Sequence, residues 1–193
     1  MKAILMSIRP EWVAKILNGE KTIEIRKKFP KDYVGWVYIY CTKDKKIFLR
    51  DFRDKKKWAA YWKFVAMEND PSNVGELPPI LNGKVVARFW CDNVEEIVCL
   101  PINGRYATET IGDSSFEKYS CLNFEQLDNY LQGKNGTAIH IPNLEVFDKP
   151  KELSEFKSYK KNIVNTKING MVFETELDNS LIKAPQSWCY VEL

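Results

Sequence analysis

Three charged side chains within six residues, Lys21, Glu24 and Arg26, could do chemistry together. In an extended strand alternate side chains share a face, so Glu24 and Arg26 would point the same way and could form a hydrogen-bonded ion pair. Lys21 places a second cation beside the same carboxylate, which leaves a net positive pocket. Such a pocket would fit a phosphate or the polar edge of a base. The alternative is that the Glu24–Arg26 pair serves only to stabilise the structure.

The residues around this triplet predict the elements that position it. Pro10 can open a helix at its first turn, and Gly19 can end that helix in a left-handed conformation. Between them apolar side chains recur at helical spacing, whereas from Lys21 onwards apolar and polar residues alternate as in a strand. We therefore expect a helix that ends at Gly19 and a strand whose isoleucines face the core. Glu24 and Arg26 would occupy the opposite face.

Short strands dominate the rest of the sequence, where aromatic and β-branched residues alternate with turn pairs such as Asn82-Gly83 and Asn169-Gly170. Asn123 is expected to cap a second helix, which ends at Gly133. Many short strands with a few helices predict an α+β domain, most simply a small mixed barrel. The other expected strands cover about residues 2–8, 36–42, 83–91, 95–100, 136–141 and 185–191.

Residues 43–57 carry most of the basic excess of the chain, and the aromatic spacing after them predicts a helix over about 51–67. Trp58 and Trp62 would lie on one face of this helix. Either that face packs on the core while the charges meet solvent, or the segment is a basic, aromatic arm for a nucleic-acid backbone and its bases. Residues 103–122 are polar and rich in turns, which predicts an irregular or partly helical segment.

Composition excludes several classes of protein. The 193 residues are 45% hydrophobic, enough for one sizeable core. No apolar run approaches the roughly 20 residues that span a bilayer, and no signal peptide is recognisable, so we expect a cytoplasmic protein without a membrane partner. Five cysteines without a Cys-x-x-Cys pair indicate neither a disulfide framework nor a zinc site. His140 is the single histidine and is interpreted as structural, so no metal and no cofactor are expected.

Charge is distributed unevenly along the chain. Residues 1–91 hold 19 Lys and Arg against 10 Asp and Glu, a balance of +9, whereas residues 92–193 hold 10 against 16, a balance of −6. A basic surface on one side suits a partner that carries phosphate, although a mixed, solvated surface gives similar counts.

Separated motifs of the sequence resemble one family. Gly19-x-Lys21-x-x-Glu24-x-Arg26 is similar to the signature of ASCH domains, relatives of the PUA RNA-binding fold. Ser7-Ile8-Arg9-Pro10 resembles the first strand and helix start of that family, and residues 136–141 with Lys149-Pro150-x-x-Leu153 resemble its late strand. The closing residues 185–190 look like the tail of bacterial and prophage members.

This resemblance implies one PUA-like mixed β-barrel over residues 1–193, with flanking helices and insertions at about 43–82, 103–122 and 154–184, the first of them helical. It also implies a cleft lined by the signature that binds RNA, single-stranded nucleic acid or a modified nucleoside. Tyr40 would stack on an unpaired base. The residues expected in this cleft are Ser7, Lys21, Glu24, Arg26, Tyr40, Thr42, Ser187 and Tyr190.

Two enzymatic alternatives follow from the same resemblance. One branch of the family hydrolyses the acetyl group of acetylcytidine, with a threonine proposed as nucleophile at the position of Glu24 and the same lysine beside it. Here a carboxylate stands at that position and could act as a base on water, which makes Lys21 and Glu24 the catalytic candidates. Ribonuclease activity is suggested for another branch. The sequence favours binding over catalysis and leaves the oligomeric state open.

Overall fold

The first strand lies inside the larger β-sheet. In the computed structural model, which describes residues 2–51, 59–62, 79–100, 106–107, 113–169 and 171–192, β1 (Lys2–Ile8) is parallel to β3 (Gly35–Cys41) and antiparallel to β14 (Trp188–Glu192). Its residues after Lys2 are buried, as its apolar sequence predicts. The strand order is β10-β6-β3-β1-β14-β11, completed by β6 (Lys84–Cys91), β10 (Glu145–Glu152) and β11 (Lys157–Ser158).

The signature strand β2 (Ile23–Arg26) is the edge of a second sheet with the order β2-β9-β7-β8. The register pairs Glu24 with Ile139 and Arg26 with Thr137, so both charged residues point to one face of this sheet. Ile23 and Ile25 belong to the apolar cluster on the other face, which confirms the predicted alternation. The other strands are β9 (Gly136–His140), β7 (Val94–Cys99) and β8 (Tyr106–Ala107).

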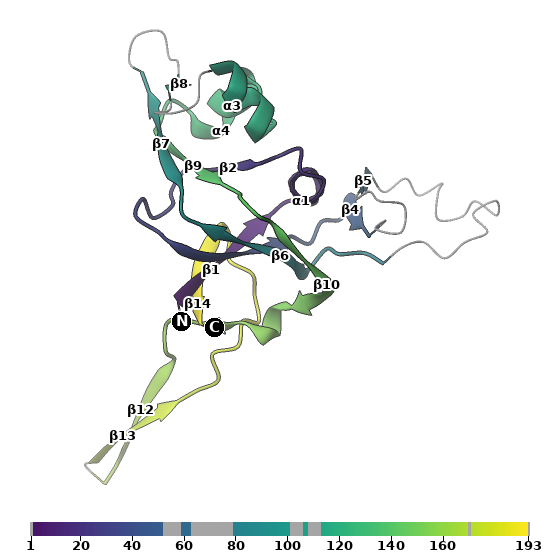
Figure 1. Ribbon diagram of the computed structural model, residues 1–193. Helices are drawn as coiled ribbons and strands as arrows, with labels where there is room; N and C mark the ends of the chain where they lie inside the picture. The colour runs from purple at the N-terminus through teal and green to yellow at the C-terminus, as the bar shows by residue number, and fades with distance from the viewer. Residues whose placement is uncertain are drawn as a thin grey trace, which may run out of the picture.

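Helix α1 (Pro10–Leu17) closes the space between the two sheets (Figure 1). Pro10 begins the helix, and Gly19 follows its end with a φ of +73°, as predicted. The buried face of α1 contacts residues of both sheets, so the main core lies between β1, β3 and β6 on one side and β9 on the other. The mixed arrangement of helices and sheets confirms the α+β class.

Helices α3 (Asp113–Ser120) and α4 (Phe124–Leu131) lie at one end of the molecule, against the outer face of the smaller sheet (Figure 1). The side chain of Asn123 accepts a hydrogen bond from the backbone of Gln126 and so caps α4, as the sequence predicts. Because α3 occupies 113–120, the segment predicted as irregular or partly helical is helical in this part.

A β-hairpin projects from the opposite end of the molecule (Figure 1). It consists of β12 (Ile163–Ile168) and β13 (Met171–Glu176), which pair Ile168 with Met171 on either side of the Asn169-Gly170 sequence. Before it, the short 3-10 helix η2 (Leu153–Glu155) follows β10. Phe156 and Leu153 pack near Tyr38 and Tyr40 on the outer face of the larger sheet, so this sheet is covered on both sides.

The helix predicted over 51–67 is wrong for its described part. Residues Ala59–Trp62 form strand β5, which is antiparallel to β4 (Ile47–Arg50). Pairing with β4 outweighs the helical spacing of the aromatic residues, since local propensity is a weak constraint beside tertiary contacts. Trp58 and the remainder of the predicted helix lie outside the described residues, and the role proposed for the segment stays a prediction.

All five cysteines are free thiols. Burial raises the pKa of Cys41, and it raises the pKa of Cys91 to about 11, so both stay protonated at neutral pH. Among the described residues, no helix combines the length and the apolar character needed to cross a bilayer.

Candidate functional site

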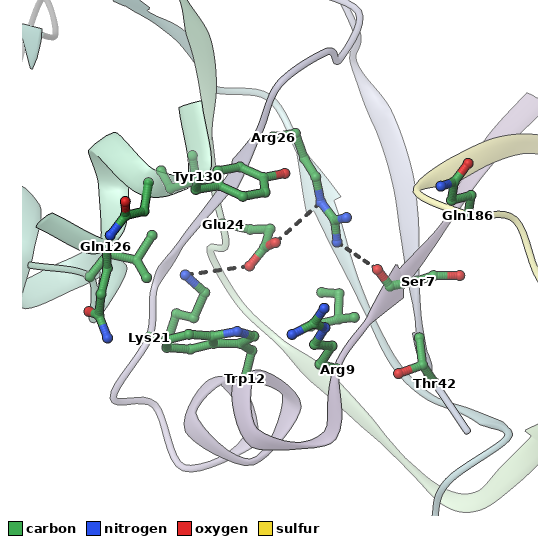
Figure 2. A pocket seen from close by; sticks show the side chains of 14 residues that line it. Ser7, Arg9, Trp12, Lys21, Glu24, Arg26, Thr42, Gln126, Tyr130 and Gln186 are labelled. Atoms are coloured by element: carbon green, nitrogen blue, oxygen red, sulfur yellow. Dashed lines mark hydrogen bonds and ion pairs between the residues drawn. The ribbon is translucent and has the colours of Figure 1, made fainter. Parts of the chain in front are cut away.

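A carboxylate between two cations forms the centre of the site (Figure 2). Glu24 Oε2 lies 3.4 Å from Lys21 Nζ, and Glu24 Oε1 lies 3.2 Å from Arg26 Nε. The three side chains are only 2%, 9% and 10% exposed for Lys21, Glu24 and Arg26. In such a desolvated place each charge depends on its neighbours, because water cannot compensate for a lost partner.

Both cations are anchored more tightly to the backbone than to Glu24. Lys21 Nζ donates to the carbonyl oxygen of Ser120 at 2.7 Å, and Arg26 Nη2 donates to the carbonyl oxygen of Ser7 at 2.7 Å. Arg26 Nη1 makes a longer contact of 3.4 Å to Ser187 Oγ. Charge-assisted hydrogen bonds are typically about 2.7–2.9 Å long, so the backbone carbonyls fix the cations while the carboxylate is held loosely.

The local chain geometry explains why Lys21 is buried here. The backbone amide of Lys21 donates to the carbonyl of Lys15, which ties the start of the strand to the end of α1. The amide of Thr22 donates to the carbonyl of Tyr119, which ties it to α3. Burial lowers the pKa of Lys21 from its ordinary value, and the Glu24 carboxylate opposes this shift.

The charged triplet opens into a pocket of about 510 Å³, within the size range of small-molecule sites. The pocket lies between α1, β2, α4 and the segment before β14. Trp12 and Tyr130 lie on opposite sides of the Glu24 carboxylate in Figure 2. The described residues that line the pocket are Ser7, Ile8, Arg9, Trp12, Lys21, Glu24, Ile25, Arg26, Thr42, Leu122, Gln126, Asn129, Tyr130 and Gln186.

Each aromatic wall stands beside a cation. Lys21 Nζ lies 5.3 Å from the centroid of the Trp12 ring, and Lys27 Nζ lies 5.4 Å from the centroid of the Tyr130 ring. Burial raises the pKa of Tyr130, so its phenol stays protonated and can donate. The pocket thus combines flat apolar surfaces with a surplus of positive charge.

Five of the residues expected in the cleft line this pocket together: Ser7, Lys21, Glu24, Arg26 and Thr42. The hydroxyl of Ser7 is already used, since it donates to the carbonyl of Pro185 at 2.7 Å. Ser187 is not among the described lining residues, but its hydroxyl oxygen accepts the long contact from Arg26 Nη1.

Two expected residues lie elsewhere. Tyr40 belongs to the cluster on the outer face of the larger sheet with Val85 and Phe156. The strand alternation places Ile39 and Cys41 toward the main core instead, so Tyr40 does not share a face with the pocket. Tyr190 packs beside Trp188 in an aromatic cluster. The structure therefore does not bring Tyr40 or Tyr190 to Glu24.

Sequence reasoning missed the aromatic and amide walls. Trp12 recurs at helical spacing with the apolar residues of α1, and Tyr130 with those of α4, and such amphipathic spacing alone does not separate a core position from a pocket wall. Tyr130 is 38% exposed, whereas Leu127 and Leu131 of the same helix are buried. Arg9, also in the lining, follows the first strand and is exposed. A signal for Arg9 existed, since it stands inside the Ser7-Ile8-Arg9-Pro10 motif.

His140 lies on the opposite face of the smaller sheet from Glu24. Its Nε2 is 2.5 Å from Oε1 of Glu95, which is buried on the neighbouring strand β7. The pairing gives His140 a partner inside the sheet and keeps it away from the pocket. Within the described ranges, no group of three or more His, Cys, Asp or Glu side chains could hold a metal ion.

Solved structures of ASCH proteins are similar to this chain. The crystal structure of ASCH from Zymomonas mobilis has a TM-score of 0.46 and 16% identity, and the match covers 78% of this chain and 73% of that one. A single-residue mutant of the same protein has a TM-score of 0.45 and 16% identity, with 79% and 77% covered. No protein-family model and no curated protein match the chain.

Proposed function

We propose that the pocket binds a nucleobase, presented by a single-stranded nucleic acid or by a modified nucleoside. The observation that carries this proposal is the Glu24 carboxylate, which is nine-tenths buried and whose contacts with its two cations among the described residues are long, at 3.2 and 3.4 Å. A carboxylate has about four lone-pair sites, so Glu24 keeps capacity to accept hydrogen bonds from a ligand. The N–H groups on a base edge are such donors.

The aromatic walls support the same ligand class. A base that reaches Glu24 would lie between Trp12 and Tyr130, which flank the carboxylate in Figure 2. Stacking of a base on an aromatic side chain contributes about 1–3 kcal/mol and suits every base, because each has a π-face.

The charge of the lining favours a ligand that also carries phosphate. Among the described residues of the lining, three cations, Arg9, Lys21 and Arg26, stand against one carboxylate, Glu24. Arg9 lines the pocket and is exposed, so the phosphate on the sugar of a bound nucleotide would meet this guanidinium within reach of solvent. The basic first half of the chain is consistent with this polarity.

Fluorescence anisotropy with labelled single-stranded RNA and DNA, and competition by free nucleosides, tests the proposal. We expect salt-dependent binding that Trp12→Leu weakens roughly 5–150-fold, the loss that corresponds to one stacked base. Trp90→Leu is the matched control, since Trp90 is 40% exposed and packs against Trp36 on the larger sheet. Absence of binding, or equal weakening by both variants, would contradict a base pocket around Trp12.

Hydrolysis of a modified nucleoside is the second candidate function. It is favoured by the position of the Glu24 carboxylate between Lys21 and Arg26, because a buried carboxylate can act as a base on water while the two cations stabilise negative charge that develops on the substrate. Liquid chromatography of N4-acetylcytidine incubated with the protein tests it. Product above the level of Glu24→Ala would support turnover, and product equal in both samples would rule out this site as its source.

A further inference from the structure

The polar groups at the base of the pocket follow a fixed order. Lys21 contacts one oxygen of Glu24 and Arg26 contacts the other, so the carboxylate stands between an ammonium and a guanidinium. Seen from the pocket, the order is donor, acceptor, donor. Figure 2 shows this sequence from Lys21 through Glu24 to Arg26.

Each of the three groups has hydrogen-bonding capacity left for a ligand. Lys21 carries three N–H donors, of which Ser120 and Glu24 take two. Arg26 carries five, and its hydrogen bonds to Ser7 and Ser187 take two of them. Among the described residues, Arg26 Nε has no aligned hydrogen bond although it faces Glu24.

The edge that complements donor, acceptor, donor is acceptor, donor, acceptor. An imide has this order, with an N–H between two carbonyl oxygens, and uracil and thymine present it through O4, N3–H and O2. Cytosine presents donor, acceptor, acceptor, and guanine presents acceptor, donor, donor. Adenine has an amino donor next to a ring acceptor. Each of these three edges would place like groups opposite one another at one or more positions, which leaves buried polar groups unpaired.

We propose that the pocket selects the imide edge of a uracil-type base: Glu24 accepts from N3–H while Lys21 and Arg26 donate to the two carbonyl oxygens. This inference rests on the proposed base-binding function and adds the class of base. The surplus of positive charge around Glu24 also disfavours a cationic ligand with the same N–H donor, such as a guanidinium, because Lys21 and Arg26 would repel it.

A ligand-side comparison tests the inference without altering the protein fold. Uridine, 3-methyluridine and cytidine are titrated as competitors against a labelled oligouridylate. 3-Methyluridine keeps the ring, the sugar and both carbonyl oxygens but carries a methyl group in place of the N3 hydrogen, so it cannot donate to Glu24. We expect uridine to bind at least about tenfold more tightly than either analogue, within the discrimination of a good paired edge contact. Oligouridylate, oligothymidylate and free uridine distinguish RNA, DNA and nucleoside as the source of the edge.

The outcomes separate this inference from the proposal beneath it. Equal affinity for uridine, 3-methyluridine and cytidine would overturn imide selection and leave the base pocket standing. No binding of any nucleoside or oligonucleotide would overturn both. In Glu24→Gln the ratio between uridine and 3-methyluridine should shrink, because a neutral amide oxygen is a weaker acceptor than a carboxylate. Glu96→Gln, which removes the same charge from strand β7 of the same sheet at a residue outside the pocket lining, should keep the ratio; an unchanged ratio in Glu24→Gln would overturn the role of Glu24.

Discussion

Two carboxylates on one face of the smaller sheet show how burial decides what an ion pair does. Glu24 on β2 and Glu96 on β7 are separated by β9, and their partners there, Ile139 and Thr137, point to the same face. Glu96 makes the shorter contact, 2.6 Å to Lys31, but its side chain is 34% exposed. Glu24 makes longer contacts and is 9% exposed.

The shorter contact is the less consequential one. Lys31 holds the pKa of Glu96 below its ordinary value, yet solvent screens this pair and replaces either partner easily. The cluster around Glu24 is largely buried, so solvent compensates less for a missing charge there, and the cluster also has bonding capacity for a ligand. Contact distance alone would rank the Glu96–Lys31 pair above the Glu24 cluster, whereas burial makes the Glu24 cluster the more important of the two.

Removing Glu24 and removing Glu96 should give the largest difference between the two regions, measured as a loss of stability. Glu24→Ala leaves Lys21 and Arg26 buried without a counter-charge, so we expect a loss of about 3–5 kcal/mol in the free energy of unfolding. Glu96→Ala should stay close to the wild type because its partner is solvated. Urea unfolding followed by circular dichroism measures both. Equal stability of the two variants would break the comparison.

The pH dependence of stability should report the burial of Lys21. Its pKa in the folded protein lies below the ordinary value of 10.5, so the unfolded chain binds more protons at pH values between the two. Stability should therefore rise as the pH is raised through that window towards 10.5. Urea midpoints across this range should show the rise in the wild type and in Lys31→Met, and lose it in Lys21→Met. The same slope in both variants would show that Lys21 is not desolvated.

Replacing the exposed cations Arg9 and Lys31 should give the smallest difference between the two regions. This difference should appear in nucleic-acid binding rather than in stability. Arg9→Ala removes a guanidinium from the mouth of the pocket, and we expect weaker oligonucleotide binding with a salt slope reduced by about one. Lys31→Ala removes a cation that belongs to the surface pair with Glu96 and should leave the slope unchanged. Anisotropy titrations at several salt concentrations measure the salt slope of each variant. A slope reduced only by Lys31→Ala would place the phosphate contact at the surface pair.

The local parts of this structure were predictable from sequence. Pro10 and Gly19 bound α1, Asn123 caps α4, and the Asn169-Gly170 turn sets the register of the hairpin, because each depends on neighbours within a few residues. The alternation in β2 likewise separates Glu24 from the isoleucines beside it.

The parts that depend on distant contacts were not predictable. The strand Ala59–Trp62 exists through its pairing with β4, against a helical pattern of aromatic residues. The pocket needs α4, whose Tyr130 lies more than 100 residues after Glu24 in the sequence. Tyr40 was expected beside the signature but faces the other side of its sheet, since the closure of the fold, not the strand itself, decides which face meets the pocket.

Nuclear magnetic resonance of tryptophan indole N–H groups tests the central claim most directly. The protein is labelled with ¹⁵N-tryptophan and titrated with oligouridylate, and the signals are assigned from Trp12→Phe and Trp90→Phe. A base bound above Glu24 predicts a shift of the Trp12 signal during the titration, while the Trp90 signal stays in place. A shift of the Trp90 signal with an unchanged Trp12 signal would contradict the pocket as the binding site.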